Sequence, residues 1–168
     1  MNKVIETILS RVSCKSYSDK KVPLSKVKQI VEAGKSAPSG MNRQICNILV
    51  LRNKNKVEKL RQASIKIFNR DRFYGASTIC IVYGKRGEPL LIEDGSVILE
   101  NMFIAATALK VDSCWINGVK DIIPFPETKL AKELGITEEY QVVGTCILGY
   151  KKEEPVRKPR KEDFIRYL

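Results

Sequence analysis

Arg11, Ser13 and Lys15 place two cations four residues apart, with a hydroxyl between them. Such a set suits a phosphate monoester, because that group carries nearly two negative charges and three acceptor oxygens. Arginine also offers phosphate a planar fork of donors. The same residues would suit an ordinary solvated helix end, where Arg11 meets the terminal carbonyls. Taken alone, the pattern favours the helix end over the phosphate site.

The loop over residues 37–44 offers a different set of groups. Pro38 stiffens this loop, and the side chains of Ser39 and Asn42 can form hydrogen bonds. Small and amide residues of this kind suit the edge of a flat heteroaromatic ring. An ordinary connection from a helix to a strand has the same composition, and it is the favoured interpretation of the loop by itself.

Two further segments could contact a ligand. Trp115, Asn117 and Gly118 close a predicted strand, where Gly118 lets the backbone approach a ligand closely and Trp115 alternatively belongs to the core. The basic run over residues 157–161 is either solvated or binds a polyanion. Nucleic-acid-binding surfaces usually add exposed aromatic residues or a recognisable module, and this run offers little of either.

The sequence contains no histidine and five singly spaced cysteines. Ser-His-Asp triads, Cys-His pairs and histidine-bound metals are therefore excluded. The cysteines form no C-x-x-C pair, so we expect buried thiols and no metal site. If the protein is an enzyme, we expect a cofactor to carry its chemistry and no side chain to act as the catalytic group.

The net charge of +11 indicates an anionic partner, which would be nucleic acid, an anionic surface or a small ligand that carries phosphate. No apolar run approaches the roughly 20 residues that a membrane helix needs. The first residues also lack the apolar stretch of a signal peptide. We therefore expect a cytoplasmic protein that contacts no membrane.

Apolar residues recur at helical or strand spacing in nine segments. The predicted helices cover residues 4–10, 26–35, 57–68, 92–109 and 128–134, and the predicted strands cover residues 46–51, 78–83, 111–116 and 141–148. Ser25 is the expected N-cap of the second helix, and residues 84–89 are expected to form a turn. This irregular alternation predicts an α+β fold with helices against a mixed sheet. It argues against a Rossmann fold, so a nicotinamide cofactor would be a visiting substrate.

Two features indicate a second subunit. Residues 102–109 of the longest predicted helix include only one polar residue, Thr107. A helix that is apolar on all sides must be covered on all sides, which a chain of 168 residues achieves with difficulty alone. Residues 153–168 are charged, interrupted by proline and poor in core residues, so we expect an arm that docks on a partner.

In their order along the chain, these motifs resemble the FMN-dependent nitroreductase family, as a small, short-chain member. The resemblance extends over nearly the whole chain. Its matching pieces are Arg11-x-Ser13-x-Lys15, the loop Ala37-Pro38-Ser39-Gly40-x-Asn42-x-Gln44, the strand end Ser113-Cys114-Trp115-Ile116-Asn117-Gly118, the pair Gly149-Tyr150, and Lys158-Pro159-Arg160.

The resemblance implies a three-layer α/β/α fold with a mixed, mostly antiparallel sheet, in one domain over residues 1–168. It also implies a homodimer with two FMN sites at the subunit interface. By the matching motifs, the ribityl phosphate would be held by Arg11, Ser13, Lys15, Lys158 and Arg160. The flavin ring would be contacted by Pro38, Ser39 and Asn42 of the partner and by Asn69 and Arg72 at the pyrimidine edge. Asn117 and Gly118 would lie near N5, and Trp115 would also contact the cofactor.

The activity implied is reduction of nitroaromatics, quinones or similar small acceptors by NADH or NADPH, through ping-pong hydride transfer at flavin N5. Two alternatives are a flavin-binding protein without activity and a basic nucleic-acid-binding domain. The chain departs from the family pattern at Ile45-Cys46, where proline and an aromatic residue are common, and Arg72 replaces the usual lysine. It also has little sequence after Gly118 to cover the site, so we expect an open pocket.

Overall fold

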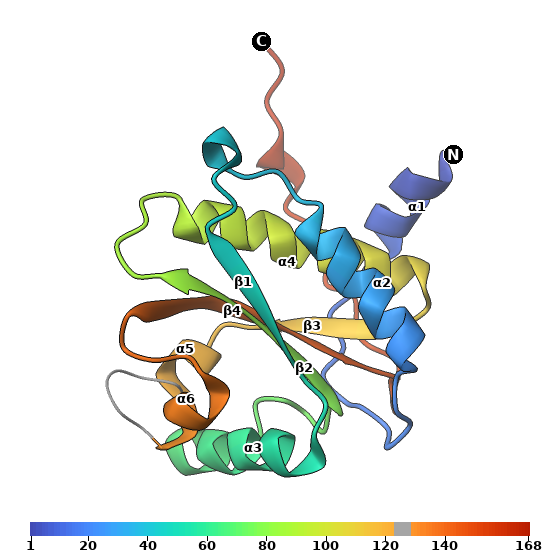
Figure 1. Ribbon diagram of the computed structural model, residues 1–168. Coiled ribbons are helices and arrows are strands. Elements are labelled where there is room, and N and C mark those ends of the chain that lie inside the picture. The colour runs from blue at the N-terminus through green and yellow to red at the C-terminus, as the bar shows by residue number, and fades with distance from the viewer. Residues whose placement is uncertain (123–128) are drawn as a thin grey trace.

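A four-stranded antiparallel sheet forms the centre of the protein in a computed structural model, which describes residues 1–122 and 129–168 (Figure 1). The strand order is β1-β2-β4-β3, so β1 and β3 are the two edge strands. The strands are β1 (Cys46–Leu51), β2 (Thr78–Lys85), β3 (Asp112–Ile116) and β4 (Tyr140–Gly149). The prediction of a mostly antiparallel sheet is confirmed, and an isolated bridge between Ser13 and Ser113 adds one parallel pairing.

Helices cover both faces of the sheet, which confirms the predicted three-layer α/β/α fold (Figure 1). One face packs against α2 (Leu24–Lys35) and α4 (Leu91–Ala108). The other packs against α3 (Lys54–Phe68), α5 (Val119–Ile122) and α6 (Lys129–Leu134). The remaining elements are α1 (Lys3–Ser10), at the periphery beside α4, and the 3-10 turns η1 (Gly40–Asn42) and η2 (Glu162–Phe164).

The central strand β2 is mostly apolar because helices cover both of its faces. Ile79 and Ile81 face the layer of α3, whereas Cys80 and Val82 face the layer of α2 and α4. Successive side chains of a strand point to opposite faces, so a strand covered on both faces needs apolar residues at every position. The neighbouring strand β4 shifts register opposite Val82 and Tyr83, as in a β-bulge.

Some predicted boundaries were wrong. Ser25 is not an N-cap, because α2 begins at Leu24 and the carbonyl of Pro23 accepts its first hydrogen bonds. Asn53 caps α3, which therefore begins before the predicted start at residue 57. The predicted turn at residue 84 is still strand, because Gly84 and Lys85 pair with β4. The sequence also gave no sign of α5, and the first residue of the predicted helix over 128–134 lies outside the described residues.

The apolar second half of α4 is covered to a large extent within one chain. Met102, Phe103 and Ala106 are buried between the sheet and α2. Gly34 of α2 makes this possible, because a Cβ atom there would lie 2.6 Å from Met102 Cγ. Uncovered apolar side chains occur on α1, which buries none of its residues.

The expectation of buried thiols is confirmed for four of the five cysteines, and Cys46 is half-buried. Among the described residues, no helix combines the length and apolar character needed to cross a bilayer.

Candidate functional site

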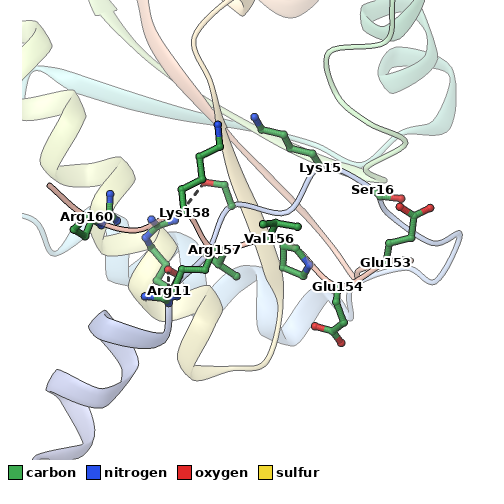
Figure 2. A pocket seen from close by; sticks show the side chains of 12 residues that line it. Arg11, Lys15, Ser16, Glu153, Glu154, Val156, Arg157, Lys158 and Arg160 are labelled. Atoms are coloured by element: carbon green, nitrogen blue, oxygen red, sulfur yellow. Dashed lines mark hydrogen bonds between the residues drawn. The ribbon is translucent and has the colours of Figure 1, made fainter.

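A pocket of about 450 Å³ collects cations from both ends of the chain (Figure 2). The N-terminal segment supplies Arg11, Ser13 and Lys15, and the C-terminal segment supplies Lys158 and Arg160. The structure thus brings together all five residues that the resemblance assigns to a phosphate. Arg157 lines the same pocket and gives it a fifth cation.

Hydrogen bonds to the ends of β3 and β4 fix the N-terminal wall of this pocket. The Cys14 amide donates to the Ser113 carbonyl at 3.0 Å, and the Ser18 amide donates to the Tyr150 carbonyl at 2.8 Å. The side chain of Cys14 is buried in the core. Because extended backbone alternates its side chains, Ser13 and Lys15 point away from the core.

The C-terminal wall is fixed to the N-terminal wall by Arg157, whose Nη2 donates to the carbonyl of Arg11 at 3.1 Å. Arg157 was predicted only as part of a basic run, because its contact with Arg11 joins residues from opposite ends of the chain. Two acids, Glu153 and Glu154, also line the pocket, but Glu154 is paired with Lys151 at 2.7 Å. The pocket therefore keeps a net positive charge.

Cys114 lies behind the pocket as a neutral thiol. Burial raises the pKa of Cys114, and the hydrogen bond with Ser13 and the charge of Lys15 offset this only in part. Ser13 also receives a long contact from Arg11 Nη1 at 3.5 Å. The hydroxyl of Ser13 thus lies between a cation and an uncharged thiol, where it can donate to an anion.

A second cluster lies at the other end of β3. The guanidinium carbon of Arg72 lies 4.7 Å from the centre of the Phe68 ring. The same ring reaches Gly118, where a Cβ atom would lie 3.2 Å from Phe68 Cζ. The structure thus brings Arg72 and Gly118 together through Phe68, a residue that the sequence indicated only as an apolar position of α3. Asn69 ends α3 in a left-handed conformation, which places the backbone of Arg72 beyond the helix.

The strand β3 sets the distance between the two clusters. Ser113 pairs with Ser13 at the cationic pocket, and Asn117 follows the end of the strand beside Gly118. Four residues of extended chain span about 13 Å at a rise of about 3.3 Å per residue. A ligand that reaches both clusters therefore has an anionic end, a linker and a planar head.

Trp115 is placed differently from its neighbours in β3. Its ring lies 6.0 Å from that of Phe103 and packs against Gly144, where a Cβ atom would lie 2.9 Å away. These contacts are on the α2 and α4 face of the sheet, whereas Phe68 and Arg72 lie toward α3. The indole ring is half-buried and packs against the core on this face of the sheet.

The loop that carries Pro38, Ser39 and Asn42 lies apart from both clusters in the same chain. It precedes β1, the edge strand opposite β3. Three strand spacings of about 4.8 Å separate these two edges by about 14 Å. One chain therefore does not bring this loop to the cationic pocket.

Asp94 of α4 holds this loop in place. Its Oδ1 accepts from the Gly40 amide at 2.9 Å, and Ser39 Oγ accepts from the Gln44 amide at 3.1 Å. Asp94 is only 6% exposed, and its Oδ2 has no hydrogen-bond partner among the described residues. The loop and Asp94 line a pocket of about 320 Å³. The sequence signal for Asp94 was an acid in the first turn of a helix, which ordinarily indicates only a helix start.

Comparisons with known proteins agree on one family. The model of the nitroreductase family matches residues 8–73 and 66–150. A crystal structure of a nitroreductase with bound FMN from Bacteroides fragilis is 30% identical, covers all of both chains and superposes with a TM-score of 0.87. A second nitroreductase structure with bound FMN, from Desulfitobacterium hafniense, is 23% identical over 100% of this chain and 99% of that chain, with a TM-score of 0.87, and supports the fold. An NADPH-flavin oxidoreductase of Vibrio harveyi is 24% identical over 95% of this chain and 70% of its own length.

Proposed function

Because this chain belongs to the nitroreductase family, we propose that it is an FMN-dependent oxidoreductase that takes electrons from NAD(P)H and passes them to a small oxidised acceptor. The observation that carries this function is the pair of clusters joined by β3. One end of the strand collects five cations, and the other presents Arg72, Phe68 and Gly118.

The donor set of the cationic pocket fits the phosphate of FMN. A phosphate monoester carries nearly two negative charges at neutral pH, which Arg11, Lys15 and Arg160 can balance beside the Ser13 hydroxyl. Each charge-assisted hydrogen bond contributes about 1.5–3 kcal/mol. Lys158 and Arg157 complete the wall from the C-terminal segment.

The second cluster fits the flavin ring. Arg72 offers a cation toward the pyrimidine edge, and its Nε is buried with no hydrogen-bond partner among the described residues. The missing side chain of Gly118 makes room for the Phe68 ring that carries Arg72, and Asn117 and Asn69 lie beside these residues in the chain. FMN bound here supplies the hydride chemistry at N5, whereas the protein binds the cofactor, orients it and stabilises charge on it.

The opposite-edge position of Pro38, Ser39 and Asn42 supports a homodimer in which this loop meets the flavin of the partner. Further support comes from apolar side chains of α1 and of the end of the chain that one chain leaves uncovered: Val4, Ile5, Leu9, Phe164, Ile165 and Tyr167. The arm over residues 153–168 divides into two parts in this proposal. Residues up to 160 line the pocket of their own chain, and the remaining residues dock on the partner.

The acceptor site of this proposal is open and accepts small flat molecules such as nitroaromatics and quinones. The segment between Gly118 and β4 is short and contains α5, the undescribed residues 123–128, α6 and residues 135–139. A nicotinamide and an acceptor would use this place in turn. The proposed location is the cytoplasm, where NADH and NADPH are available.

Two measurements on the purified protein test the function. An FMN enzyme has a flavin absorbance spectrum, and its absorbance bleaches on rapid mixing with NADPH or NADH and returns on addition of a quinone. A flavin-binding protein without activity would be yellow but would not bleach. A nucleic-acid-binding domain would be colourless, and its affinity for nucleic acid would fall steeply with salt. Either of the last two results would refute the proposal.

A further inference from the structure

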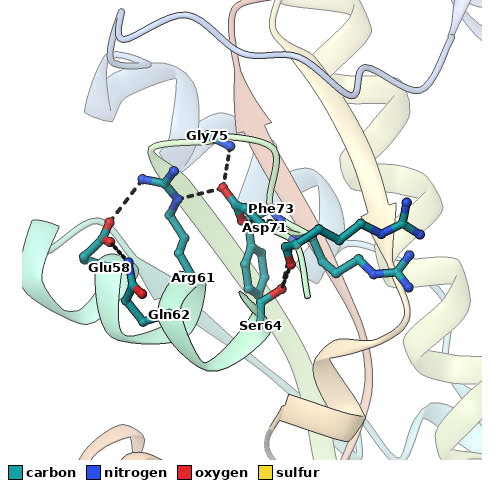
Figure 3. A network of polar contacts seen from close by, with 9 residues as sticks. Glu58, Arg61, Gln62, Ser64, Asp71, Phe73 and Gly75 are labelled. Atoms are coloured by element: carbon teal, nitrogen blue, oxygen red, sulfur yellow. Dashed lines mark hydrogen bonds and ion pairs between the residues drawn. The ribbon is translucent and has the colours of Figure 1, made fainter. Parts of the chain in front are cut away.

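The turn that carries Arg72 is held by one buried hydroxyl (Figure 3). Ser64 of α3 is fully buried, and its Oγ donates to the carbonyl of Arg70 at 3.1 Å. The same Oγ accepts from the amide of Arg72 at 2.9 Å. Both sides of the turn are therefore attached to one point on the helix, which fixes where the Arg72 side chain starts.

Asp71 holds the rest of this turn through both carboxylate oxygens (Figure 3). Oδ1 accepts from the amide of Phe73 at 2.8 Å, and Oδ2 accepts from the amide of Gly75 at 3.0 Å. Oδ2 also forms an ion pair with Arg61 Nε at 2.8 Å, and Arg61 is paired in turn with Glu58 at 3.1 Å. The negative charge of Asp71 is thus neutralised by Arg61 of α3.

Arg72 differs from Arg61, because it forms no ion pair with any of the described residues. Its guanidinium lies on the ring of Phe68, which also contacts Gly118. A ring stack fixes the direction of the guanidinium without removing its charge. The acid closest to Arg72 in the chain is Asp71, and that carboxylate is directed to Arg61 and to backbone amides.

We propose that Arg61 is a positioning residue that holds the Asp71 carboxylate away from Arg72, so that the charge of Arg72 remains free to stabilise the reduced flavin. This inference rests on the proposed function, because it assumes that Arg72 faces the flavin. A fixed cation favours the reduced, more negative ring over the oxidised ring, and therefore raises the reduction potential. Without Arg61, the field of Asp71 would cancel part of this effect.

The test measures the reduction potential of bound FMN against a reference dye in Arg61→Met. One adjacent charge without a partner weakens the binding of reduced FMN relative to oxidised FMN on the order of tenfold. For a two-electron couple, this factor lowers the potential by about 30 mV. The affinity for oxidised FMN, measured by quenching of flavin fluorescence, is expected to change less.

The double variant Arg61→Met/Asp71→Asn separates positioning from a general structural role. Removing the carboxylate as well takes away the negative charge that Arg61 had balanced, so the potential should return most of the way to the wild-type value. A structural role alone predicts that the double variant is as impaired as the single variant, or more so. The matched control is Lys59→Met on the same helix, which removes one cation from an exposed pair with Glu133 and should leave the potential unchanged.

The outcomes are distinguishable. Wild-type protein that binds no FMN refutes the proposed function itself. Wild-type protein that binds FMN, with an unchanged potential in Arg61→Met or no recovery in the double variant, overturns only the inference. If Arg61→Met does not fold, Asp71→Asn alone serves as the test. It removes one negative charge from the turn of Arg72 and leaves Arg61 paired only with Glu58, so a rise in potential supports the inference and the absence of a rise overturns it.

Discussion

Replacement of Arg11 and Arg160 by methionine in one variant should release FMN while the protein stays folded. The two residues come from opposite ends of the chain and meet in the cationic pocket. Neither Arg160 nor Arg11 forms an ion pair among the described residues, and the Arg11 side chain forms a long hydrogen bond with Ser13 at 3.5 Å. The link from Arg157 to the backbone carbonyl of Arg11 does not need the Arg11 side chain. The free energy of unfolding should therefore change little in this variant.

The expected loss of affinity follows from the charges. Each charge-assisted bond to phosphate contributes about 1.5–3 kcal/mol, and the lower value applies because Arg160 is exposed to solvent and salt. Two such bonds contribute about 3 kcal/mol. At about 1.4 kcal/mol per factor of ten, the Kd of FMN should rise about a hundredfold. Part of the wild-type affinity should also be lost in high salt, and the variant should show a weaker salt dependence.

The assay is titration of apoprotein into FMN, followed by quenching of flavin fluorescence, with thermal melting of the apoprotein as the test of folding. The control variant is Lys3→Met/Lys161→Met, which removes one cation from each end of the chain but touches no lining residue of the pocket. It should bind FMN with the wild-type Kd. Full retention of flavin by Arg11→Met/Arg160→Met, with an unchanged Kd, would refute the assignment of this pocket to phosphate.

Three further results are expected. Gly118→Ala should lower the free energy of unfolding in urea by about 1–3 kcal/mol, because the new methyl group would lie 3.2 Å from the Phe68 ring. An unchanged urea midpoint would contradict this contact. Asp94→Ala should lower the free energy of unfolding by about 1–3 kcal/mol, because the Gly40 amide loses its hydrogen-bond acceptor. Asp94→Asn should recover part of this loss. Burial raises the pKa of Cys80 from about 9 to about 12. Between these two pH values the Cys80 thiol is protonated in the folded protein and ionised in the unfolded chain. The free energy of unfolding should therefore be unaffected by this thiol below about pH 9 and should fall between about pH 9 and pH 12. The melting temperature of Cys80→Ala should fall less steeply across this range, and the remaining pH dependence comes from other thiols with raised pKa values such as Cys46 and Cys146.

Local patterns were sufficient for most of the elements. The strand over residues 46–51 was predicted with the bounds it has, because a β-branched apolar run between two loops is a strong local signal. The absence of histidine limited the chemistry without any structure. Errors occurred where the local signal was weak or ambiguous. The four residues of α5 are too few to show a period, and Ser25 matches an N-cap by type although Pro23 takes that position.

The sequence by itself determined the elements, the charge and the candidate groups at both ends of the chain, because these depend on residues close together in the chain. The tertiary structure decided which candidates meet. The strand order puts the loop of Pro38 and the strand β3, which leads to Gly118, on opposite edges of the sheet. The roles of Arg157, Phe68 and Arg61 depend on contacts with residues that only the packed sheet and helices bring near. Pairing between distant strands sets these contacts, and no local pattern encodes it.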